Sequence, residues 1–287
     1  MTKLSHEAKI GLLFVAIAAF LFATSPIFIR WADSVSSYEI TFWRLLTAAL
    51  TVAAMMLYRG QKWTVPRGEW AKFLLFGLIT ALHFLFYIAS LSFTTIAHAL
   101  ALVYTAPIFV TLFSAFFLKE SIPRRKWLGI LITVLGIAIL AGFQPNFTRR
   151  MLFGDVLALG SAIMFGFYSV AGRSQRHHYS LFTYAMTTYG MGALWALPAA
   201  LLTFTPDGYS PKAIFSILAM GIFPLGLGHT LYNAALRRVH ASYVNSIATQ
   251  EVTGGILLGA LLLHEIPGIN EIIGAVVALT GIFIVIL

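Results

Sequence analysis

The sequence predicts an all-α polytopic membrane protein with ten transmembrane helices. Hydrophobic residues make up 59% of the chain and charged residues only 10%, whereas soluble domains are about one quarter charged. Ten apolar runs reach the length of about 20 residues that crosses a bilayer, and the connections between them are too short to fold a soluble domain. The runs cover residues 10–30, 38–58, 70–92, 96–118, 126–143, 152–172, 180–204, 212–236, 241–263 and 269–287.

The distribution of basic residues predicts the orientation of these helices. With the N-terminus inside, the cytoplasmic segments carry fourteen of the 19 Lys and Arg residues and the opposite side carries four. This bias follows the positive-inside rule and places both termini in the cytoplasm. The net charge of +9 therefore indicates membrane orientation, because a nucleic-acid surface would cluster its basic residues among aromatic and polar groups. The first apolar run is too long for a cleavable signal peptide.

The two halves of the chain repeat each other. A shift of 145 residues superposes Tyr87 on Tyr232, Glu120 on Glu265 and Gly136 on Gly281. Each half, residues 1–146 and 147–287, then holds five spans, and an odd number turns the second half upside down. Two inverted five-helix repeats are the construction of many secondary transporters, which bind substrate near the midplane between the repeats.

Two corresponding segments, "LKESIPRRKWLGILITVLG" and "LHEIPGINEIIGAVVALTG", resemble the repeats of the drug/metabolite transporter superfamily with its paired EamA-type repeats. Within it, "FATSPIFIRWA" and "EITFWRLLTAAL" resemble the amino-acid exporters of the YddG type. The resemblance covers essentially the whole chain. It implies ten helices, a central cavity, and export of aromatic and other neutral amino acids.

Polar residues on the third span follow one face of a helix. Thr80, His83, Tyr87, Ser90 and Thr94 recur at intervals of three or four residues, and groups of this kind avoid lipid. The stripe predicts that His83 and Tyr87 line the substrate pathway. Hydrogen bonding between helices is the alternative.

The eighth span contains a predicted break. In "GIFPLGLGHTLYNAAL" Pro224 and two glycines weaken the helix just before His229, Tyr232 and Asn233, and interrupted helices are a good pointer to a transporter site. A simple kink satisfied by a neighbouring helix is the alternative.

Glu251 lies deep in the ninth run, and it points away from the polar residues of its own helix toward glycines and small apolar residues. This direction favours a structural acceptor packed against a neighbouring helix. The other interpretation is that Gly254 and Gly255 bend the helix and turn Glu251 to the cavity, where it takes a substrate ammonium or a coupling proton.

Three further positions carry expectations. Arg44 in the second span is expected to snorkel to the outer surface, with capture of a substrate carboxylate as the alternative. Trp195 is read as ordinary apolar lining. The fifth and tenth spans, with glycine pairs on single faces, are expected to lie at the periphery, packing closely at one side and meeting lipid on the other, and to contact no substrate.

The sequence thus predicts a secondary transporter of the bacterial cytoplasmic membrane that exports amino acids by alternating access. An exporter of drugs or cationic metabolites, proton-coupled through Glu251, is the alternative. The sequence lacks the motifs of a catalytic centre, and without cysteine it has no disulfide or thiolate metal site. No enzyme activity, cofactor, metal or nucleic-acid partner is expected, the amino-acid substrate and the lipid bilayer are the expected partners, and a monomer suffices. The predicted substrate-binding residues are His83, Tyr87, Ser90, Tyr104, His229, Tyr232, Asn233 and Asn245, and Glu251 is the candidate for coupling.

Overall fold

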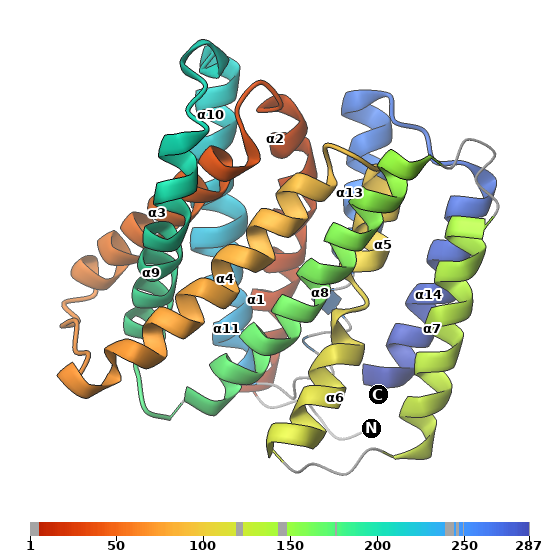
Figure 1. The fold of residues 1–287 in the computed structure, drawn as a ribbon. Helices are drawn as coiled ribbons and strands as arrows, with labels where there is room; N and C mark the ends of the chain where they lie inside the picture. Colours follow the sequence, from red (N-terminus) through yellow and green to blue (C-terminus); the bar gives the residue numbers. More distant parts are fainter. Residues whose placement is uncertain are drawn as a thin grey trace.

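The computed structural model describes residues 6–118, 123–142, 148–175, 177–238, 244, 247–248 and 250–286, and these residues form helices joined by short connections (Figure 1). Seven continuous helical stretches in the described residues are long and apolar enough to cross a membrane. They are His6–Trp31, Ser37–Tyr58, Arg67–Ser90, Ile96–Phe117, Arg149–Gly172, Leu181–Leu202 and Pro211–Leu236. Gln250–Leu263 and Ile272–Ile284 are shorter apolar helices. With Arg124–Gly142, each of the ten predicted spans corresponds, in its described part, to one, two or three consecutive helical segments.

The helices run in chain order. The first half holds α1 (His6–Ala23), α2 (Ser25–Trp31), α3 (Ser37–Tyr58), α4 (Trp70–Ser90), α5 (Ile96–Val103), α6 (Ala106–Leu118) and α7 (Arg124–Gly142). The second half holds α8 (Arg149–Gln175), α9 (Leu181–Leu202), α10 (Pro211–Met220), the π-helical segment η3 (Gly221–His229), α11 (Thr230–Leu236), α13 (Gln250–Leu263) and α14 (Ile269–Ile286).

Three spans are interrupted near their middle. The first breaks at Thr24, whose hydroxyl donates to the carbonyl oxygen of Leu21 at 2.7 Å, and the fourth breaks between α5 and α6, just before Pro107. The eighth passes through η3, which contains Pro224. Proline lacks an amide hydrogen and clashes with the preceding turn, so a regular α-helix does not continue through these points. The break predicted in the eighth span is confirmed, whereas α13 runs through Gly254 without the predicted bend.

The helices of one half pack against those of the other in reciprocal pairs. α1 packs against η3, α11 and α13, while its repeat counterpart α8 packs against α4, α5 and α6. α3 lies against α9, and α7 lies against α14 (Figure 1). Inverted repeats related by a two-fold axis produce this exchange of partners. The domain boundary predicted between residues 146 and 147 lies outside the described residues.

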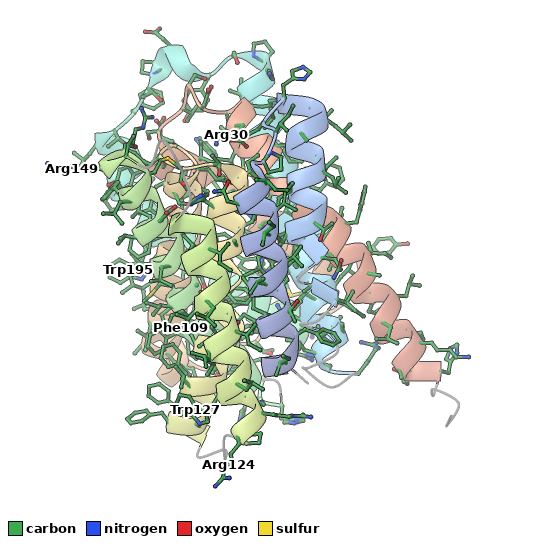
Figure 2. The ribbon with its side chains drawn as sticks, turned by 90° about the vertical axis from the view of Figure 1, so that its right-hand side faces the viewer. Arg30, Phe109, Arg124, Trp127, Arg149 and Trp195 are labelled. Atoms are coloured by element: carbon green, nitrogen blue, oxygen red, sulfur yellow. The ribbon has the colours of Figure 1, made fainter. Side chains whose placement is uncertain are left out.

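Basic residues identify the two ends of the bundle. Figure 2 shows Arg30 and Arg149 at one end and Arg124 at the opposite end, where both chain termini also lie (Figure 1). The first end is called the outer end here and the second the inner end, following the orientation that the basic residues predict.

Glycines allow α7 and α14 to touch along their backbones. A Cβ atom at Gly136 would lie 2.3 Å from the backbone nitrogen of Ala278, and one at Gly281 would lie 2.4 Å from that of Thr133. Contact this close is typical of membrane helices with small residues at their interface. The close packing predicted for the glycine faces of these two helices is against each other, and neither helix is among the lining of the cavity described below.

We expect Gly281→Ala to destabilise the protein by about 1–3 kcal/mol, because the added methyl group forces α7 and α14 apart. Thermal unfolding of the detergent-solubilised protein measures the effect. Gly190→Ala is the matched control, since a Cβ at Gly190 meets nothing within 4 Å. Equal melting temperatures for the two variants would contradict the close packing of α7 on α14.

Candidate functional site

A cavity of about 60 Å³, large enough for a few water molecules, lies between the two halves of the bundle. Both halves contribute side chains to its wall, and the interrupted spans place several of them there. The lining residues are Phe22, Ser25, Arg44, His83, Phe84, Tyr87, Val103, Tyr104, Ala106, Pro107, Phe165, His229, Tyr232, Ala248 and Glu251. Its position between inverted halves is where secondary transporters bind substrate.

Aromatic rings from four spans form one side of this wall. The ring of His229 lies 4.6 Å from Phe22 and 5.5 Å from Phe84, between centroids. Phe165 lies 5.0 Å from His83 on the neighbouring span. Rings at these separations and in tilted or edge-to-face arrangements attract each other. The result is a rigid apolar surface that suits a flat or aliphatic side chain.

Ser161 on α8 holds the ring of His83. The hydroxyl of Ser161 donates to the backbone oxygen of His83 at 2.9 Å, and Nδ1 of His83 lies 3.0 Å from the carbonyl oxygen of Ser161. Because a carbonyl oxygen only accepts, this geometry assigns the proton of a neutral His83 to Nδ1. His83 therefore combines both interpretations of the polar stripe: its ring lines the cavity, and its Nδ1 bonds a neighbouring helix.

Arg44 lies in the cavity wall, which corrects the expectation that it snorkels to the outer surface. Only 2% of the residue is exposed. Its Nη1 donates to the hydroxyl of Ser25 at 3.0 Å and lies 3.8 Å from the sulfur of Met220. Its guanidinium carbon lies 4.4 Å from the centre of the Phe84 ring. Ser25 on α2 and Met220 on α10 lie against the guanidinium, which stays inside the bundle.

Glu251 lines the cavity and also accepts a hydrogen bond from a neighbouring span, so it combines features of the two interpretations drawn from the sequence. The residue is 8% exposed, and the hydroxyl of Tyr104 donates to its Oε2. Tyr104 is the cap residue that ends α5 at the break in the fourth span. The glycine beside Glu251 serves packing instead, because a Cβ at Gly255 would lie 2.5 Å from Leu100 on α5.

The predicted substrate-binding residues separate into three groups. His83, Tyr87, Tyr104, His229 and Tyr232 all line the cavity. Ser90 and Asn233 are outside its lining: Ser90 donates to the backbone oxygen of Tyr87 at 2.7 Å, and Asn233 donates to the hydroxyl of Tyr168 at 3.2 Å. Asn245 lies outside the described residues. Whether the lining residues bind substrate stays a prediction.

The sequence analysis did not identify two groups of interior residues. Phe84 and Phe165 line the cavity, yet apolar residues in apolar spans give no signal in one sequence. Asp155 on α8 is another buried carboxylate, which the sequence analysis did not identify. Its Oδ1 accepts from the Thr94 hydroxyl at 2.9 Å, and its Oδ2 lies 3.2 Å from Nδ1 of His98. Asp155 thus joins α8 to α5 and to the connection before it.

Trp195 lies at the periphery (Figure 2) and is 47% exposed, so it does not line the interior.

Arg30 joins the two halves at the outer end. Its Nη2 lies 2.8 Å from Glu265, in the connection between α13 and α14, and donates to the carbonyl oxygen of Thr94 at 3.0 Å. A further hydrogen bond runs from Nη1 to the carbonyl oxygen of Leu91. Glu265 in turn accepts from the backbone amide of Ile96 at 3.3 Å. These contacts, called the outer latch below, tie α2 to the α4–α5 and α13–α14 connections.

Glu39 makes a second link at this end. It accepts from the hydroxyls of Thr205 and Tyr209, each at 2.6 Å, and thereby joins α3 to the connection between α9 and α10. Partial burial and the carboxylate of Glu39 raise the pKa of Tyr209 to about 12, so its hydroxyl remains a donor at neutral pH. The outer end is therefore closed by contacts between the halves.

A bundle of two reciprocally packed halves around a buried cavity, lined by aromatic rings and a few polar groups, is the architecture of a membrane transporter. Comparison with known proteins gives the particular family: the EamA-like transporter family matches residues 9–142 and again residues 152–287. The chain belongs to this family, and it is a multi-pass integral membrane protein.

Individual relatives align along most of the chain. The Pseudopaline exporter CntI of Pseudomonas aeruginosa is 28% identical over 273 residues, which are 93% of each protein. YoaV of Bacillus subtilis, an uncharacterized transporter, is 25% identical over 244 residues, or 84% of each. Solute carrier family 35 member G1 of Homo sapiens is 22% identical and covers 90% of this chain and 73% of its own length. One crystal structure shares the fold with a TM-score of 0.72 at 20% identity, over 96% of this chain and 95% of that one.

Proposed function

We propose that this transporter exports neutral amino acids, aromatic ones included, by alternating access about the central cavity. The observation that carries the proposal is the composition of the cavity wall. It holds one guanidinium, from Arg44, and one carboxyl group, from Glu251, beside a surface of aromatic rings. A neutral amino acid presents the same combination: one negative group, one positive group and an uncharged side chain.

Export as the direction has support from a relative that is named an exporter. The described residues contain no group of three His, Asp or Glu side chains placed to hold a metal ion, and the conclusion of transport rather than catalysis rests on the family. The mechanism that fits inverted repeats is a rocking of one half against the other, which exposes the cavity to each side in turn. The interrupted spans would absorb this motion at Thr24, Tyr104 and η3.

Export of drugs or cationic metabolites, proton-coupled through Glu251, is the second candidate. Glu251 in an aromatic cavity favours it, because a carboxylate and ring faces both attract cations. Arg44 opposes it, since a buried guanidinium in the same wall repels a cation. The balance favours a zwitterion.

Flux into proteoliposomes distinguishes the candidates. Labelled phenylalanine, labelled threonine and a lipophilic cation would be tested separately, with and without a pH gradient. We expect saturable phenylalanine and threonine flux and no protein-dependent flux of the cation. Cation flux without amino-acid flux would replace the proposal by the second candidate, and a response to the gradient would show that a proton is coupled.

Cysteine labelling tests whether the cavity is the pathway. The chain contains no cysteine, so single cysteines at Ala106 and Ala248, which are small lining residues, report on the cavity alone. We expect a water-soluble thiol reagent to modify both from at least one side of the membrane, and phenylalanine to slow the reaction. Ala193→Cys is the control, because Ala193 is buried in the core outside the cavity. Cavity cysteines as unreactive as this control would contradict the proposed pathway.

A further inference from the structure

Arg44 is a buried cation without a direct ion pair among the described residues. Its Nε is buried as well and has no hydrogen-bond partner in this part of the chain. Its polar contact, the hydroxyl of Ser25, is neutral. A buried charge is costly unless it is paired and hydrogen-bonded. A guanidinium left in this condition at a cavity wall is suited to an anionic group of a ligand, which it can bind through two parallel hydrogen bonds.

Neighbouring groups add hydrogen-bonding capacity on the same side. The Ser25 hydroxyl accepts from Arg44, and on the side of the cavity lined by Tyr87 its own proton can donate to the Tyr87 hydroxyl or to a ligand. Nδ1 of His229, another lining residue, is buried without a hydrogen-bond partner. The ligand group expected here is a carboxylate, which accepts several hydrogen bonds at once.

Glu251 provides the opposite charge in the same wall. It stands on α13 of the second half, and Arg44 stands on α3 of the first half. No salt bridge joins them within the described residues, so each remains available to a ligand in the cavity that they share. The hydroxyl of Tyr104 holds Oε2 of Glu251 in place.

We infer that Arg44 and Glu251 bind the two ends of one zwitterion, Arg44 the α-carboxylate and Glu251 the α-ammonium, and that both ends are required for transport. This inference rests on the proposed function and names the chemistry by which that site selects its substrate. The substrate side chain then lies against the aromatic rings of Phe22, Phe84 and Phe165. An amino acid so bound connects the two halves, because each half supplies one of the charges.

Selectivity follows from the cost of leaving either charge unpaired. Removal of one partner from a buried, hydrogen-bonded charge pair reduces affinity by at least about 30-fold. An analogue that lacks one charged end is therefore expected to lose this factor even when its aromatic ring is unchanged. Phenylalaninamide lacks the carboxylate, and 3-phenylpropionate lacks the ammonium.

Competition against labelled phenylalanine in proteoliposomes tests the inference on the wild-type protein. We expect unlabelled phenylalanine to compete, and phenylalaninamide and 3-phenylpropionate each to require at least about 30-fold higher concentration. If either analogue competes as well as phenylalanine, the corresponding charge is not recognised and the inference is overturned. If phenylalanine itself is not transported, the proposed function fails and the inference falls with it.

Two variants test which residue binds which charged end of the zwitterion. The measurement is equilibrium binding to the detergent-solubilised protein, because binding can be measured even in a variant that no longer transports. Arg44→Gln is expected to bind phenylalanine and phenylalaninamide equally weakly while it still rejects 3-phenylpropionate. Glu251→Gln is expected to show the reverse pattern. Thr80→Val is the control, because the Thr80 hydroxyl bonds within its own helix and lies outside the cavity lining. If both variants keep the wild-type preferences, the assignment is wrong.

Discussion

Replacement of Arg44 by methionine is expected to reduce amino-acid flux by at least about 30-fold without lowering the melting temperature of the protein. The flux falls because the substrate carboxylate loses its cationic partner. Stability does not fall, because methionine fills the volume of the side chain and removes the desolvation cost of an unpaired charge. Replacement of buried ion pairs by apolar residues of similar volume has often been neutral or stabilising by about 1–4 kcal/mol. Flux in proteoliposomes and thermal unfolding in detergent measure the two effects.

A loss of flux without a loss of stability distinguishes a binding role of Arg44 from a structural role. If the guanidinium mainly joins helices through Ser25 and Phe84, Arg44→Met will unfold at a lower temperature. Arg44→Lys is the control variant: it keeps the positive charge but not the planar fork of donors, so we expect flux between those of the wild type and Arg44→Met. Wild-type flux in Arg44→Met would contradict a role for this residue in the site.

Removal of the outer latch by Glu265→Ala is expected to expose the cavity to the outer side. Arg30 and Glu265 are each about a quarter exposed, with 27% of each side chain accessible, so their ion pair contributes about 0.5–1 kcal/mol. Loss of this contact shifts the balance between closed and open outer ends by roughly two- to fivefold. The rate at which a reagent on the outer side modifies Ala248→Cys measures the shift.

An ion pair between two residues at the start of the third span provides the control. Lys72, near the start of α4, pairs with Glu69 three residues earlier. The outer latch lies beyond the other end of α4, so Lys72→Ala should leave the labelling rate unchanged. Equal labelling rates with and without Glu265→Ala would show that the outer latch does not hold the outer end closed.

Much of the fold follows from the sequence because lipid imposes simple rules on it. Runs of about 20 apolar residues became helices, and Pro224 with its glycines marked the break at η3. The stripe on the third span identified an interior face, since His83 and Tyr87 both line the cavity. These inferences depend only on the periodicity of one helix or on the local effect of proline.

The positions that the sequence mispredicted or left open depend on packing between helices. Arg44 lies seven residues after the start of α3, about 10 Å along its axis. That depth permits either snorkelling or burial, and the cover provided by Ser25 and Met220 decides the outcome. Glu251 points away from the polar residues of its own helix. The side to which it points is the cavity wall, where Tyr104, at the end of α5, donates to its carboxylate. Asp155 sits near the start of its span, and its partner His98 comes from the other half.

The transport of a zwitterionic amino acid through the cavity between Arg44 and Glu251 is tested most directly by counterflow. Proteoliposomes loaded with unlabelled phenylalanine would be diluted into a trace of labelled phenylalanine. We predict that the wild-type protein accumulates label transiently above the equilibrium level and that Arg44→Met does not. Accumulation that is equal in the two proteins, or that is absent in the wild type, would contradict this mechanism.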